Sequence, residues 1–265
     1  MYGQTVPSEM RNKELYTYRR PLGVTGVITA GNFPIAVPSW KIIPALLCGN
    51  TVVWKPSDDA ASIAYLFAKL LQEAGVPKGV VNIVHGSGEG AGQSLLKMVD
   101  AGYLQKFSFT GSTAVGRRVG EVCGRNLLVP SLELGGKNPL VVMEDADIDL
   151  AVNGSIWASF GTAGQRCTSA GNIILHKNIA KEFKTKFLEE AKKIRIGDPG
   201  LGEQVLYGPM MAKRFMDNFM KYYEVGKADG ATLLYGNGQI TNNNKPENFV
   251  GNPEDGLFVW PVIWD

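Results

Sequence analysis

Two short segments of the chain hold residue types that can react with a carbonyl carbon. Cys167 ends the segment Gly164-Gln165-Arg166-Cys167, and Glu133 lies between two leucines just before Gly135-Gly136. A thiolate attacks carbonyl carbon readily, and a nearby carboxylate can take a proton from water or from a thiol. The chain has only two histidines, so we expect covalent chemistry on an aldehyde by a cysteine and a glutamate.

Each of these residues also has an ordinary structural explanation. Most free cysteines are small buried apolar residues, and Cys167 alone leaves core packing and catalysis equally open. Its polar, glycine-containing loop favours catalysis, and Arg166 would favour a thiolate if it pointed toward the sulfur. Glu133 could be a plain carboxylate of an edge strand, whereas partial burial beside the two glycines would suit a general base.

Three further positions follow expected strands. The Asn32 side chain can donate to an oxyanion, although a turn asparagine is the commoner role. Lys55 and Asp58 can bond ribose hydroxyls or phosphate, or can be surface charges. The stretch 109–116 predicts a strand, a glycine turn and a helix start, which offers free backbone amides to a phosphate.

The apolar pattern along the chain alternates between strands and helices. This alternation predicts an α/β fold with a doubly wound parallel sheet, whose ligands bind beyond the carboxyl ends of the strands. Residues 1–20 are expected to form an extended arm or hairpin. The expected strands are 24–29, 51–54, 80–84, 107–110, 129–134, 139–143, 173–176 and 231–235, and the clearest helices are 38–48, 60–74, 113–124, 147–160, 178–194 and 211–228.

Composition narrows the function classes. The 265 residues include 27 basic and 25 acidic side chains, a net charge of +2, which favours neither nucleic acid nor a membrane surface as a partner. The uncharged run 21–40 contains three prolines, so a strand, a loop and a helix start explain it better than a membrane span. Three widely spaced cysteines and no signal-peptide pattern at residues 1–4 indicate a reducing, cytoplasmic location without disulfides or a metal site.

Taken together, the motifs resemble the aldehyde dehydrogenase superfamily from Pro21 onward. The resemblance implies a Rossmann-type cofactor domain over 21–135 and a second α/β domain carrying the nucleophile over 136–265. The motifs are Asn32-Phe33-Pro34, Trp54-Lys55-Pro56-Ser57, Phe109-Thr110-Gly111-Ser112, Leu132-Glu133-Leu134-Gly135-Gly136-Lys137 and Gly164-Gln165-Arg166-Cys167, in the family's order and approximate spacing.

The resemblance also implies roles for single residues. Cys167 would form a thiohemiacetal with the aldehyde, Asn32 and a backbone N–H would hold the oxyanion, and Glu133 would activate the water that releases the acid. Hydride would pass to NAD or NADP. The residues that would contact this cofactor are Lys55, Ser57, Asp58, Gly111, Ser112, Gly116, Leu134 and Gly135. The partners implied are a small-molecule aldehyde and further copies of the subunit, as a dimer or tetramer.

The chain departs from the family pattern in three ways. Gly31 replaces an aromatic residue before Asn32, so the substrate cannot be carried over. Asp58 replaces a glutamate; its carboxylate should repel a 2′-phosphate, which favours NAD, while its shorter reach leaves NADP open. The family's segments before Met1 and after Asp265, including a second cofactor-binding glutamate motif, are not matched. We therefore expect an internal fragment with incomplete cofactor and catalytic domains.

Two other functions compete with aldehyde oxidation. Members of the CoA-acylating branch pass the acyl group to a thiol, and they generally lack the glutamate that Glu133 matches. A non-catalytic relative of this fold would be expected to lose the cysteine or the glutamate. Because the chain keeps both Cys167 and Glu133, the sequence favours hydrolytic aldehyde oxidation.

Overall fold

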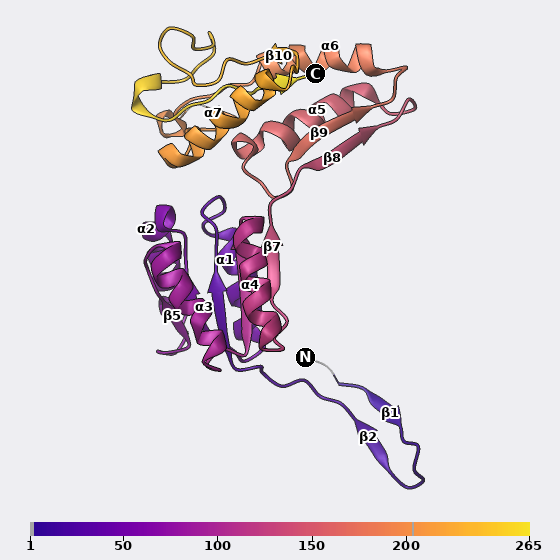
Figure 1. Cartoon of the computed structure of the whole chain (residues 1–265), viewed down its shortest axis with the longest axis vertical. Coiled ribbons are helices and arrows are strands. Elements are labelled where there is room, and N and C mark those ends of the chain that lie inside the picture. The colour runs from indigo at the N-terminus through magenta and orange to yellow at the C-terminus, as the bar shows by residue number, and fades with distance from the viewer. Residues whose placement is uncertain (1–2, 203) are drawn as a thin grey trace. The chain divides into compact units, whose positions relative to one another are not determined.

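The structure is a computed structural model that describes residues 3–202 and 204–265. The chain forms two compact units, one running to Leu134 and the other from Gly135 to Asp265 (Figure 1). Each unit has its own buried apolar core, so each is described by itself.

The first unit begins with a short antiparallel hairpin. Strands β1 (Thr5–Pro7) and β2 (Glu14–Tyr16) pair with Val6 opposite Leu15. All six strand residues are exposed. A two-stranded hairpin without a covered face is marginally stable in water, so the hairpin is an arm and contributes little to the core of the unit.

A five-stranded parallel sheet forms the centre of the first unit. Its strands are β3 (Val24–Ile28), β4 (Thr51–Lys55), β5 (Val81–Ile83), β6 (Lys106–Gly111) and β7 (Ser131–Leu134), in the order β5-β4-β3-β6-β7. Every neighbouring pair is parallel. The chain therefore winds outward from β3 in one direction and then returns to its other side at β6. Such a reversal is the usual position of a ligand crevice in an open α/β sheet.

Helices cover both faces of this sheet. Helices α1 (Ala36–Leu47) and α2 (Ala61–Glu73) pack with Val27, Val52 and Trp54 in one buried cluster. Helices α3 (Gln93–Asp100) and α4 (Thr113–Arg125) pack with Phe107 and Phe109 in another. Alternate residues of one strand point to opposite faces, which explains why Val52 and Val53 belong to different clusters. This is the doubly wound arrangement that the sequence predicts.

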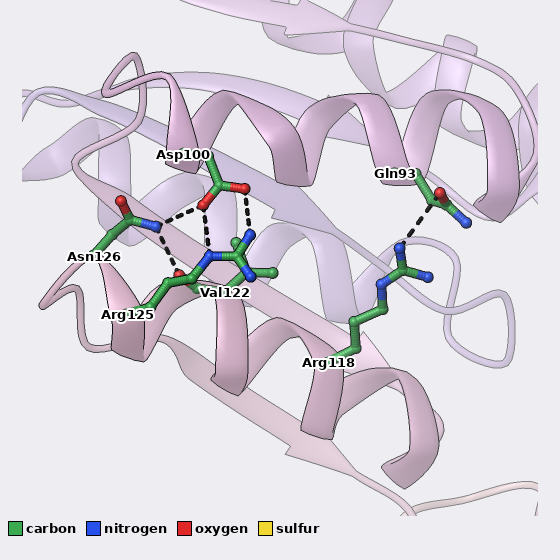
Figure 2. Close-up of polar contacts among 6 residues, drawn as sticks. All are labelled: Gln93, Asp100, Arg118, Val122, Arg125 and Asn126. Atoms are coloured by element: carbon green, nitrogen blue, oxygen red, sulfur yellow. Dashed lines mark hydrogen bonds and ion pairs between the residues drawn. The ribbon is translucent and has the colours of Figure 1, made fainter.

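Polar contacts tie α3 to α4 at the protein surface (Figure 2). The Arg125 guanidinium donates through Nε and Nη2 to the two carboxylate oxygens of Asp100, and Asn126 Nδ2 donates to the same carboxylate. The hydrogen bonds from Arg125 and then from Asn126 lower the pKa of Asp100. Paired hydrogen bonds between a guanidinium and a carboxylate fix the relative orientation of the two groups. These bonds therefore hold the end of α3 against the end of α4.

The second unit is also α/β, but its strands form two small sheets. Strands β8 (Asn138–Val142) and β9 (Ala170–Leu175) are parallel neighbours connected through α5 (Ile148–Phe160). Strands β10 (Leu233–Tyr235) and β11 (Ile263–Trp264) form a separate antiparallel pair. Helix α6 (Ala180–Lys192) carries Phe183 and Phe187 into the main core of the unit. Helix α7 (Lys213–Ala228) buries Met216, which packs in a smaller separate cluster, and Tyr223.

Most observed boundaries lie within two residues of the sequence predictions, and two differences are larger. Strand β9 begins at Ala170 instead of residue 173, because Asn138 at the start of β8 pairs with Ala170. Strand β11 was not expected, since a two-residue strand after Pro261 has too short a pattern to detect. Among the described residues, no helix combines the length and the apolar character that crossing a bilayer requires.

Candidate active site

The parallel sheet brings most of the predicted first-unit residues to one edge. Asn32 follows β3, Lys55 ends β4, Gly111 ends β6, and Glu133 is the last residue but one of β7. Parallel neighbours place all their carboxyl ends at the same edge of a sheet. These four residues, far apart in sequence, are therefore gathered at the edge where α/β folds bind ligands.

Lys55 is buried, and its ammonium group donates a hydrogen bond of 2.9 Å to Asp58 Oδ1. Asp58 is exposed at the start of the helical turn Asp58–Ala60. Ser57 precedes this turn, and its hydroxyl donates to Asp59 Oδ2 at 3.4 Å. A buried lysine held at a strand end is not a freely solvated surface charge. The arrangement offers a cation and an exposed carboxylate side by side.

The glycine turn after β6 leads directly into α4. Ser112 is the residue before this helix, and its hydroxyl accepts a hydrogen bond from the Val115 N–H. Gly116 lies in the helix against Leu134: a Cβ added at Gly116 would lie 2.5 Å from Leu134 Cδ2. Gly135, in contrast, is exposed with open space around its Cα. Gly116 therefore allows a close approach of α4 to β7.

Asn32 and Glu133 differ in exposure. Asn32 is half-buried in the loop before α1, whereas the Glu133 side chain is exposed in the described structure. Of the two alternatives that the sequence leaves open for Glu133, the exposure agrees with the carboxylate of an edge strand. The physical reason is that β7 is an edge strand paired only with β6, and its residues alternate between half-buried leucines and exposed polar side chains.

Lys41 is a residue that the sequence analysis missed. It is half-buried in α1, and its ammonium group donates a 2.9 Å hydrogen bond to Ser108 Oγ on β6. Burial lowers the pKa of Lys41, and the negative charge of Glu133 opposes this shift. The available signal was that Lys41 is the single charged residue in the otherwise apolar helix Ala36–Leu47.

In the second unit, Cys167 lies in the loop between α5 and β9. Its side chain is exposed and its thiol is free, so core packing does not explain it. Immediately before it, Thr162 (φ 58°) and Ala163 (φ 53°) both adopt left-handed backbone conformations, followed by Gly164 at φ 69°. This conformation costs roughly 1–2 kcal/mol for each residue with a side chain. Strained backbone of this kind is concentrated at functional sites.

The Arg166 side chain is turned toward α5. Its guanidinium carbon lies 4.3 Å from the centre of the Trp157 ring, and its Nε donates to Thr162 Oγ1 at 3.1 Å. The sequence analysis raised the possibility that Arg166 points toward the sulfur of Cys167. The contacts of its guanidinium support the loop, and they show no thiolate partner.

A hollow of about 610 Å³ lies beside this loop within the second unit. It is bordered by the β9 segment Ala170–Ile173, by Phe183 and Phe187 of α6, and by the end of the chain from Val259 to Asp265. Cys167 is not among the residues that line it. Its lining nevertheless includes Ala163, Gly164, Arg166 and Ser169, which flank Cys167 in the sequence.

The sequence pattern described as the aldehyde dehydrogenase family matches residues 1–264. The chain belongs to the aldehyde dehydrogenase family. The motifs containing Asn32, Lys55, Gly111, Glu133 and Cys167 all lie inside the matched region, so the family assignment covers both units.

Relatives and solved structures agree with this membership. The α-ketoglutaric semialdehyde dehydrogenase of Bacillus subtilis is 39% identical over 263 residues, which are 99% of this chain and 51% of the relative. A betaine aldehyde dehydrogenase of Staphylococcus aureus solved with NAD⁺ is 30% identical with a TM-score of 0.89, covering 99% and 50% of the two chains. An NADP-dependent enzyme of Escherichia coli is 34% identical with a TM-score of 0.86, covering 99% and 51%. The chain thus spans about half the length of these family members.

Proposed function

We propose that the protein oxidises an aldehyde to the carboxylic acid with NAD or NADP, through a covalent intermediate on Cys167. The observation that carries the proposal is an exposed cysteine thiol behind a strained turn, in a chain of the aldehyde dehydrogenase family. In this proposal residues 21–135 form the dinucleotide-binding domain and residues 136–265 the catalytic domain. The active protein would be an oligomer in the cytoplasm.

The described residues fit a dinucleotide at the carboxyl edge of the first sheet. Lys55 supplies a buried cation for ribose or phosphate oxygens, and the exposed Asp58 carboxylate can accept from ribose hydroxyls. The amino end of α4 at Ser112 supplies backbone N–H groups that suit a phosphate. Leu134 and Gly135, where β7 ends, would complete the contact set. The nicotinamide, when bound, supplies the acceptor for the hydride.

The chain's own residues would carry the covalent steps. The Cys167 thiolate adds to the aldehyde carbon and forms a thiohemiacetal, while the Asn32 amide and the backbone N–H at Cys167 donate to the oxyanion. Loss of hydride from this carbon leaves a thioester on Cys167. Glu133 then takes a proton from water, the hydroxide adds to the thioester, and the acid leaves with return of the thiol.

Measuring NADH or NADPH formation by absorbance at 340 nm over a panel of aldehydes tests this proposal. Cys167→Ala should show no burst, because the covalent intermediate cannot form. Glu133→Gln should show a burst followed by little turnover, because the thioester cannot be hydrolysed. Cys48→Ala is the control, since Cys48 is also an exposed free thiol but has no proposed role. Turnover of Cys167→Ala at the wild-type rate would overturn the mechanism.

The same assay separates oxidation to the acid from transfer to coenzyme A. Addition of CoA should leave the rate and the carboxylic acid product unchanged, because Glu133 provides the base for water. The exposed Asp58 carboxylate should repel the 2′-phosphate of NADP, so we expect Asp58→Ser to raise kcat/KM with NADP relative to NAD. An acyl-CoA product would favour the CoA-acylating alternative.

A further inference from the structure

The turn formed by residues 162–164 sets the course of the main chain into Cys167. Thr162 is β-branched and has φ 58° and ψ 34°, a conformation that is a genuine outlier for this residue type. Such a conformation persists only when surrounding contacts determine it. Two side chains outside the proposed chemistry contact this loop: Arg166 reaches Thr162 directly, and Asn138 reaches the main chain at Cys167 and Ser169.

Arg166 ties the turn to the last part of α5. Its Nε donates to Thr162 Oγ1 at 3.1 Å, while the guanidinium carbon lies 4.3 Å from the centre of the Trp157 ring. Gly161 leaves room for this arrangement, since a Cβ added there would lie 2.7 Å from the Arg166 Nη2. A planar guanidinium can stack on a ring and donate a hydrogen bond at the same time. The Arg166 side chain therefore connects Thr162 of the turn to Trp157 of α5.

Asn138 fixes the other side of the cysteine. From the first position of β8, its Nδ2 donates to the carbonyl oxygen of Cys167 at 2.8 Å and to that of Ser169 at 2.9 Å. Ser169 is bound back to Arg166 by two contacts: the Arg166 N–H donates to Ser169 Oγ, and the Ser169 N–H donates to the Arg166 carbonyl. The loop around Cys167 is therefore held by Arg166 of the loop itself, which lies over Trp157 of α5, and by Asn138 of β8.

We propose that Arg166 and Asn138 are positioning residues that hold the strained loop 161–169 and thereby fix the direction of the Cys167 thiol. Neither acts on the substrate in this proposal; each acts through the main chain of the loop. The inference rests on the proposed function for its catalytic consequence, and on the hydrogen bonds above for its structural part. A thiolate must lie within a few tenths of an ångström of its productive position, because a displacement of about 1 Å can cost roughly 100-fold in rate.

The test compares two substitutions with matched controls from the same unit. Arg166→Met keeps the length of the side chain and removes its donors, and Asn138→Ala removes the bridging amide. Arg214→Met removes another arginine that lies over an aromatic ring, at 4.8 Å from Phe215. Asn248→Ala removes another asparagine whose amide donates to two backbone carbonyls, those of Lys193 and Ile194.

The first measurement is hydrogen–deuterium exchange of the peptide covering 161–170, with the unfolding midpoint in urea as a check on folding. Each test substitution should raise exchange in this peptide by about tenfold or more, because the amides of Gln165 and Ser169 lose their fixed acceptors. The controls should leave this peptide unchanged. Unchanged exchange in both Arg166→Met and Asn138→Ala would overturn the inference; if one variant does not fold, the other decides.

The second measurement is the pre-steady-state burst of NADH. We expect the burst rate to be about 10- to 100-fold slower in the test variants, with little change in KM for the cofactor. Arg166→Lys should recover part of the burst rate, because lysine keeps a hydrogen-bond donor but lacks the planar group that stacks on Trp157. Faster exchange with a wild-type burst would also overturn the positioning role. If the wild-type protein forms no NADH with any aldehyde, the proposed function fails, and exchange alone then decides whether the two residues hold the loop.

Discussion

Helix α4 contains three glycines at four-residue spacing, and substituting each by alanine should separate helix propensity from packing. Gly116, Gly120 and Gly124 lie on one face of the helix. Alanine is favoured over glycine by about 0.8–1.0 kcal/mol in a helix interior. The three positions differ in what the new methyl group would meet, so the same substitution gives three different expected results.

At Gly124 nothing lies within 4 Å of the new Cβ, and at Gly120 the nearest atom is Leu132 Cδ1 at 3.7 Å. Both substitutions should stabilise the protein by up to about 1 kcal/mol. At Gly116 the new Cβ would lie 2.5 Å from Leu134 Cδ2 and 3.0 Å from Cδ1. Overpacking of this kind costs about 1–3 kcal/mol. Gly116→Ala should therefore be neutral or destabilise the protein by up to about 2 kcal/mol.

Urea unfolding followed by circular dichroism at 222 nm measures all three values. The double substitution Gly116→Ala with Leu134→Ala isolates the contact, because the alanine at 134 removes the atoms that clash. In that background Gly116→Ala should be stabilising by about 1 kcal/mol, as it is at Gly124. If Gly116→Ala alone stabilises the protein as much as Gly124→Ala, the close approach of α4 to β7 is wrong. In our proposal the contact bears on function, because Leu134 directly follows Glu133 in the sequence.

Three further predictions concern stability, pH and thiol reactivity. Thr29→Val removes the acceptor of the buried Trp54 indole N–H, which lies 2.9 Å from Thr29 Oγ1, and should cost about 1–3 kcal/mol in urea unfolding. The control Thr185→Val, at an exposed position of α6, should change stability by less than about 0.5 kcal/mol. Equal effects would contradict the buried bond. Asp100→Asn should lower the free energy of unfolding at neutral pH, because Arg125 lowers the folded-state pKa of Asp100. The stability that Asp100 contributes is present above its unfolded pKa of about 3.9 and is lost as the pH falls through the folded value. A stability difference between variant and wild type that grows below pH 4 would contradict this reasoning. Iodoacetamide should label Cys48 and Cys167 in the native protein and leave Cys123 unlabelled, because Cys123 is buried and burial raises its pKa. Mass spectrometry of the labelled peptides measures the three rates. Labelling of Cys123 as fast as that of the other two cysteines would refute the prediction.

The sequence predicted the first unit well because its local signals agree with its tertiary structure. Short apolar segments alternate with segments whose apolar residues recur at helical spacing. Gly49, Gly75 and Gly102, which have positive φ values, follow the ends of three helices. The secondary structure of such segments can be predicted because their local preference agrees with the global fold. The second unit was predicted less accurately, because β11 is only two residues long and β9 gains its first residues by pairing with β8.

The residues of the candidate site were predicted by motif, but their contacts were not. Lys55 was expected as a cofactor ligand, yet nothing in the sequence states that it is buried and bonded to Asp58. Lys41 was missed because its partner Ser108 lies on a strand far along the chain. Long-range pairs of this kind depend on the order of strands in the sheet, which periodicity does not encode.

The loop before Cys167 shows most clearly where sequence reasoning ends. By intrinsic preference Thr162 and Ala163 avoid left-handed backbone, so a local prediction would assign them ordinary conformations. In the structure Thr162 accepts a hydrogen bond from Arg166, whose guanidinium lies over Trp157, while Asn138 donates to the carbonyl of Cys167 further along the loop. Local preference and the observed backbone disagree at the residues that lead to Cys167, the nucleophile in our proposal, and natural proteins most often tolerate strain at functional sites. In our proposal the chemistry of Cys167 therefore depends on Arg166 and Asn138, whose side-chain contacts the motif alone does not reveal.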